Sequence, residues 1–144
     1  MCIRDSVNHM KKAHNLLIGK NTAEDIKIKI GSVSSYDGEG AMDVKGRNLT
    51  DGLPKSVEIT SAEIRDVLAE PVSKIIAAIK ETLEVTLPEL AADIIDRGIY
   101  LAGGSSQLRG LPELISKETK MQVHIPEKPL DCVALGTSIK LRRA

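Results

Sequence analysis

Aromatic side chains are almost absent from this 144-residue sequence, which contains two Tyr and neither Trp nor Phe. Sites that stack nucleic-acid bases or sugars on aromatic rings are therefore not expected. Lys and Arg together number 20, as do Asp and Glu, so no net charge favours binding to nucleic acid or to an anionic membrane surface. We predict no nucleic-acid partner.

Cysteine is also scarce, since only Cys2 and Cys132 are present. Two distant cysteines make neither a disulfide framework nor a zinc site. Cys132 has no His or Asp near it in sequence, and we expect a small buried thiol. No apolar run approaches the roughly 20 residues of a transmembrane helix, and no secretory signal is recognisable. These features favour a cytoplasmic location.

The first six residues, Met1 to Ser6 (MCIRDS), resemble a translated sequencing adapter. We treat residues 1–6 as an artefact and exclude them from fold reasoning, as is done for a tag. On this interpretation the natural protein begins upstream of Val7.

The remaining composition, 42% hydrophobic and 28% charged, is typical of a globular domain with an aliphatic core. Apolar residues at helical spacing predict the end of a helix at residues 7–15 and further helices at 22–30, 61–83, 88–97, 111–120 and 130–141. Asn21 or Thr22 is expected to cap the second of these. Pro71 should kink the long helix or begin a new one.

Two alternating segments, residues 41–47 and 55–60, predict strands joined by a turn at Asp51-Gly52. Residues 99–102 and 121–125 predict a buried strand and a second strand, with a helix between them. A strand–helix–strand unit favours a parallel pair. The expected fold class is therefore α/β. We expect residues 7–34 and 61–144 to form part of a large α/β subdomain and residues 35–60 a small β lobe.

The first candidate site follows the strand at 99–102 and comprises Gly103, Gly104, Ser105 and Ser106. Ligands of open α/β sheets bind beyond the carboxyl ends of strands. Glycines there let a ring or phosphate approach the backbone, and serines add hydroxyl groups. A tight strand–helix turn is the alternative interpretation.

The second candidate site lies on the helix at 22–30. Ala23, Ile26 and Ile30 share one stripe, and Lys27 and Glu24 flank it, so these two side chains could line a cleft. A surface ion pair is the alternative. Asp25 and Lys29 are expected to face solvent. His9, His14 and His124 show no spacing typical of metal ligands, so we predict no metal site.

Several segments together resemble the MreB family of actin-like proteins. They are NLLI (15–18), TAEDIK (22–27), GRNL (46–49), DGLP (51–54), LPELAADIIDRG (87–98), LAGGSSQLRG (101–110) and PLDCVA (129–134). The resemblance covers about Val7 to Leu141 and implies C-terminal subdomains of the actin/Hsp70/sugar-kinase superfamily.

The resemblance implies that Glu24, Asp25, Ile26 and Lys27 contact adenosine and that Gly103 to Ser106 close over the same nucleoside. Two departures from the family are visible. The family usually has Arg where Asp25 stands, and a third Gly, then often Ala, where Ser105 and Ser106 stand. The serines could narrow the adenine pocket.

The resemblance also implies that the phosphate loops and catalytic acidic residues precede this segment. We therefore predict no catalytic residues in it and no ATPase activity by the 144-residue chain alone. The full-length parent is expected to bind ATP with Mg²⁺ and to polymerise into membrane-associated filaments. These filaments would act with cell-wall morphogenesis proteins at the inner membrane to direct cell shape and peptidoglycan synthesis. Two alternatives remain: another ATPase of the superfamily, chaperone-like or a sugar kinase, and a short non-enzymatic interaction module.

Overall fold

The fold was analysed in a computed structural model, which describes residues 2–141. The chain divides into two compact units, Met1–Ile75 and Ile76–Ala144. The subdomain boundaries expected from the sequence, residues 7–34 with 61–144 and residues 35–60, stay a prediction.

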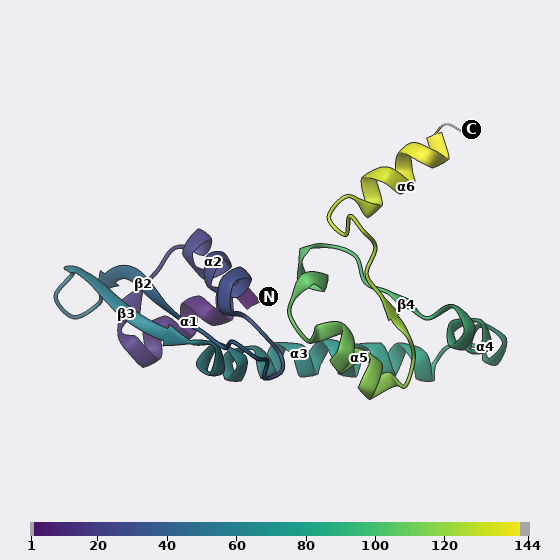
Figure 1. The fold of residues 1–144 in the computed structure, drawn as a ribbon, viewed down its shortest axis with the longest axis horizontal. Helices are drawn as coiled ribbons and strands as arrows, with labels where there is room; N and C mark the ends of the chain where they lie inside the picture. Colours follow the sequence, from purple (N-terminus) through teal and green to yellow (C-terminus); the bar gives the residue numbers. More distant parts are fainter. Residues whose placement is uncertain (1, 142–144) are drawn as a thin grey trace. The chain divides into compact units, whose positions relative to one another are not determined.

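The first unit begins with helix α1 (Cys2–His14), strand β1 (Leu16–Leu17) and helix α2 (Lys20–Ile30). Strands β2 (Ala41–Asn48) and β3 (Pro54–Thr60) follow, and helix α3 (Ser61–Glu84) starts directly after β3. The three strands form an antiparallel sheet in the order β1-β2-β3. Figure 1 shows β2 and β3 as a long hairpin with α1 and α2 beside it.

The predicted hairpin is confirmed, including the pairing of its apolar positions. Met42 lies opposite Ile59 and Val44 opposite Val57, so one face of the hairpin is apolar. Val44 and Ile59 are buried there. The predicted turn is also present: Gly52 has a φ of 75°, a conformation that glycine adopts without strain, and its N–H donates to the Asn48 carbonyl at 3.0 Å.

The core of the first unit is aliphatic, as the scarcity of aromatics requires. α1 contributes Met10 and α3 contributes Ile64, Leu68 and Val72. The remaining buried apolar side chains come from β1, the β1–α2 link, α2 and the hairpin: Leu16, Ile18, Ala23, Ile26, Ile30, Val44 and Ile59. This core holds the candidate helix α2 in place.

The start of α2 differs from the prediction. The helix begins at Lys20 and its N-cap is Gly19, with no side-chain capping bond from Asn21 or Thr22. Its end agrees, since the Gly31 N–H donates to the Lys27 carbonyl at 3.1 Å. α3 continues through Pro71 as one helix, so no second helix begins at this proline.

The second unit contains α4 (Pro88–Arg97), β4 (Ile99–Tyr100), a 3-10 turn η1 (Gly104–Gln107), α5 (Leu111–Thr119), β5 (Val123–His124) and α6 (Cys132–Leu141). β4 and β5 pair in parallel, as predicted from the strand–helix–strand order. The buried apolar side chains among its described residues are Leu108, Leu111 and Ile115.

The expectation of a buried strand at residues 99–102 is wrong for this chain. β4 has two residues, Ile99 is half-buried, and Tyr100 is 67% exposed. Parallel strands are buried when neighbouring strands and helices cover both faces, and within residues 2–141 this sheet consists of β4 and β5 alone. The Cys132 thiol is likewise half-exposed and lies 3.1 Å from the Lys128 carbonyl.

Candidate functional site

The first group of candidate residues lies on α2 in the first unit. The predicted stripe is confirmed: Ala23 and Ile26 are fully buried and Ile30 is 5% exposed. Lys27, beside that stripe, is half-buried, whereas Glu24 and Asp25 are exposed. Ile26 therefore anchors the helix in the core, and Lys27 and Glu24 present polar groups at its margin.

The second group, Gly103 to Ser106, forms the loop between β4 and α5 in the second unit. Gly103 has a φ of 86°, in the region that favours glycine. Its N–H donates to the Pro129 carbonyl at 2.7 Å, which ties the loop to the segment before α6. A Cβ added to Gly104 would lie 3.3 Å from Leu130 Cδ2, so that position has little free space.

The two serines of this loop have different surroundings. Ser106 is 4% exposed, and its hydroxyl donates to the Gly103 carbonyl at 2.6 Å. Ser105 is exposed. Ser106 therefore fixes the turn, and Ser105 is the serine whose hydroxyl is presented to solvent.

The two groups belong to different compact units. Their joint action on one ligand stays a prediction.

A cluster that the sequence did not predict joins α1 to α3 in the first unit. The Nε2 atoms of His9 and His14 lie 2.5 Å and 2.6 Å from the same oxygen of Glu63, Oε1. The two imidazole rings meet edge to face, with centroids 5.9 Å apart. The five-residue spacing of the histidines is not a recognised ligand pattern.

The electrostatics of this cluster favour an ionised Glu63. Partial burial raises the pKa of its carboxyl, but hydrogen bonds and charge interactions with His9 and His14 outweigh burial, so its net pKa lies below the ordinary value. Thr60 and Glu63 also form the backbone half of a capping box at the start of α3. The Glu63 N–H donates to the Thr60 hydroxyl at 3.3 Å, while the Glu63 carboxylate binds the histidines.

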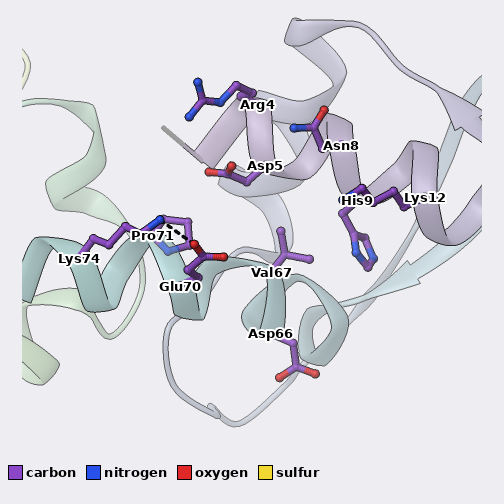
Figure 2. Close-up of a pocket in the computed structure, with 10 residues that line it drawn as sticks. All are labelled: Arg4, Asp5, Asn8, His9, Lys12, Asp66, Val67, Glu70, Pro71 and Lys74. Carbon is purple, nitrogen blue, oxygen red and sulfur yellow. Dashed lines mark hydrogen bonds and ion pairs between the residues drawn. The ribbon is translucent and has the colours of Figure 1, made fainter.

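A pocket of about 400 Å³ lies between α1 and α3 of the same unit (Figure 2). His9 lies in its α1 wall, and Asp66, Val67 and Glu70 lie in its α3 wall. Glu70 pairs with Lys74 at 2.6 Å, one turn further along α3. Arg4 and Asp5, from the first turn of α1, also line the pocket.

Among residues 2–141, no helix has the length and apolar character needed to cross a membrane.

The sequence matches the family model described as MreB/Mbl protein over residues 4–144. It is 44% identical over 135 residues to the cell shape-determining protein Mbl of Bacillus subtilis, covering 94% of this chain and 40% of the relative. It is 42% identical over 130 residues to the cell shape-determining protein MreB of Escherichia coli, covering 90% of this chain and 38% of that one. The chain thus spans about 40% of the length of the curated relatives it matches.

Solved structures show the same fold. The crystal structure of MreB5 of Spiroplasma citri bound to ADP superposes with a TM-score of 0.90 at 39% identity, over 95% of this chain and 42% of that one. The form of MreB5 bound to AMPPNP gives a TM-score of 0.89. A MamK double helical filament structure matches with a TM-score of 0.68 at 18% identity, over 90% of this chain and 40% of that one, which shows an actin-like fold alone.

Proposed function

Because this chain belongs to the MreB/Mbl family, we propose that it is the nucleoside-binding part of an ATP-binding, actin-like cytoskeletal protein that polymerises and directs cell shape. The observation that carries the proposal is the family match over residues 4–144, together with 44% identity to a cell shape-determining protein. Family membership favours this function over a chaperone-like ATPase, a sugar kinase or a short interaction module.

The nucleotide is proposed because the MreB5 relative has been solved with ADP and with AMPPNP. On α2, the Glu24 carboxylate is exposed and free to accept hydrogen bonds from ribose hydroxyls. The half-buried Lys27 offers its aliphatic stem to the base while its ammonium group stays in water. Asp25, which is exposed, lies next to Glu24 on the same helix. Ile26 is buried and anchors the helix in the core.

The loop at Gly103 would contribute backbone to the same nucleoside. Gly103 and Gly104 lack a Cβ, so a flat ring can approach the chain closely there. Ser105 adds an exposed hydroxyl, whereas the Ser106 hydroxyl is already bound to the Gly103 carbonyl. Mg²⁺ and the phosphate groups would be bound by residues of the full-length protein outside this sequence.

Self-association into filaments is part of the proposal. It follows from the family resemblance and from the filament described for MamK, whose fold this chain shares. Association with the membrane and with cell-wall morphogenesis proteins at the inner membrane, where the filaments would guide peptidoglycan synthesis, is proposed for the full-length protein on the family resemblance alone.

The test is ADP binding to the full-length protein that contains this segment, measured by calorimetry. Glu24→Ala should weaken ADP affinity at least tenfold, because a lost hydrogen bond to a charged group costs about 1.5–3 kcal/mol. Lys27→Ala should weaken it several-fold, because the base loses the apolar contact with the lysine stem. Lys29→Ala, an exposed position on the same helix, is the control and should leave affinity unchanged. Unchanged affinity in both test variants, with the fold intact by circular dichroism, would contradict the proposed site.

A further inference from the structure

The strongest unassigned feature is the cluster of His9, His14 and Glu63. It brings two imidazole nitrogens and a carboxylate oxygen within 4.8 Å of one another. All three residues belong to the first unit, from two turns of α1 and the first turn of α3. They lie outside the adapter-like start and apart from the residues proposed to bind the nucleoside.

We propose that His9, His14 and Glu63 bind a divalent transition-metal ion, namely Zn²⁺. Two imidazoles and one carboxylate form a donor set that zinc accepts, with a fourth position left for water. Imidazole nitrogen is a poorer ligand for Mg²⁺ and Ca²⁺, which prefer oxygen ligands. The proposal does not depend on the proposed nucleotide function.

The distances in the cluster are shorter than those around a metal ion. With zinc–ligand bonds of about 2.0–2.1 Å, neighbouring ligand atoms of a tetrahedral site lie about 3.3 Å apart. The two nitrogen–oxygen distances are 2.5 Å and 2.6 Å, as expected for hydrogen bonds to a shared oxygen. Inserting the ion therefore requires each nitrogen–oxygen pair to separate by less than about 1 Å. The two nitrogens, which lie within 4.8 Å of each other, must come to a similar spacing, a shift within reach of side-chain rotation.

The surroundings permit both that shift and access of the ion. The side chains of His9, His14 and Glu63 are 26%, 23% and 26% exposed, so none is locked in the core. The neighbouring residues Met10 and Ile64 are fully buried and fix the two helices that present the ligands. The ligand backbones are therefore held in place while the ligand atoms reach solvent.

Zinc at this position would join the end of α1 to the beginning of α3. The ion binds the folded arrangement of three residues separated by up to 54 positions. It would therefore stabilise the first unit by an amount that grows with the logarithm of the free zinc concentration, once this exceeds the dissociation constant. The cluster would then be a structural zinc site and not a catalytic one.

The test uses the 144-residue chain without an affinity tag, stripped with a chelator and titrated with ZnCl₂ under reducing conditions. We expect one Zn²⁺ per chain by calorimetry and a melting temperature that rises with zinc concentration. CoCl₂ should give visible d–d absorption that zinc displaces. A chain that binds no zinc would overturn the proposal.

Variants locate the site. His9→Gln and His14→Gln should each weaken zinc affinity at least tenfold, as loss of a ligand requires. Glu63→Gln keeps an oxygen that can accept from both imidazoles, so it should fold by circular dichroism and still lose zinc affinity. His124→Gln, in the second unit, is the matched control and should bind zinc like the unchanged chain. Equal zinc binding by the unchanged chain and a His9→Gln/His14→Gln double variant would overturn the assignment.

Discussion

The Ser106 hydroxyl donates a hydrogen bond to the Gly103 carbonyl at 2.6 Å, and the Ser106 N–H donates to the same carbonyl at 3.2 Å. Two donors from one buried serine thus close the turn of the proposed nucleoside loop. Ser106 therefore stabilises the conformation of this loop.

Replacing this serine should weaken the loop. Ser106→Ala removes the side-chain donor to the Gly103 carbonyl and should cost about 1 kcal/mol of stability, the usual net value of a buried hydrogen bond. Ser105→Ala, at an exposed position of the same loop, should change stability by less than about 0.5 kcal/mol. Urea denaturation of both variants measures the difference, and equal midpoints would contradict the role given to Ser106.

Gly46 should be intolerant of any side chain. A Cβ at this position in β2 would lie 2.5 Å from the Leu17 carbonyl oxygen and 2.9 Å from Leu16 Cγ. Gly46→Ala should therefore force β1 away from β2 and destabilise the first unit by about 1–3 kcal/mol. Gly40→Ala is the control, because nothing lies within 4 Å of its added Cβ. Thermal denaturation of the two variants should separate them clearly.

The isolated chain should not turn over ATP. Hydrolysis requires Mg²⁺, phosphate clamps and a positioned water, and the 144 residues contain no segment resembling the family's phosphate loops. Phosphate release should equal that of a buffer blank, and ATP binding in calorimetry should be weak or absent. Turnover above the blank, or tight ATP binding, would show that the sequence holds more of the nucleotide site than proposed.

The second unit should associate through its exposed apolar side chains. None of the α6 side chains is buried, and Val133, Leu135, Ile139 and Leu141 are all at least 48% exposed. Exposed apolar patches of this kind promote association. The double substitution Leu135→Lys/Ile139→Lys should lower the apparent mass of the 144-residue chain in concentrated solution, because two exposed apolar side chains become charged. Light scattering measures this mass. A paired change at Lys11 and Lys12 to Ala, on the exposed side of α1, should not lower it.

Local patterns in the sequence predicted most elements because their causes are local. The alternation of apolar and polar residues predicted which face of the hairpin is apolar, with Met42, Val44, Val57 and Ile59 on it. The dipeptide Asp51-Gly52 predicted its turn. The stripe of Ala23, Ile26 and Ile30 on α2 depends only on helical spacing and was also confirmed. The same spacing placed Lys27 at the margin of the buried stripe.

Two of the wrong or missed features, the exposure of β4 and the cluster of His9, His14 and Glu63, depend on residues distant in sequence, whereas the third, the cap of α2, is local. β4 was expected to be buried because its residues are apolar, but burial requires neighbouring strands that this sheet lacks. Gly19 caps α2 where Asn21 or Thr22 was expected, because the helix begins earlier, directly after the β1 segment. The cluster of His9, His14 and Glu63 arises from tertiary packing of α1 against α3, and no spacing along the chain indicates it.

Edge strand β3 of the three-stranded sheet has features that disfavour pairing with a strand of another chain. β3 lies at the edge of the sheet in the described part of the molecule, so one side of its backbone is open to a further strand. Pro54 supplies no N–H at the start of that edge, and the exposed charges of Lys55 and Glu58 would have to lose water if another strand docked there. Amyloid-like stacking of this hairpin is therefore disfavoured, and self-association of the isolated chain should leave its β-sheet content unchanged.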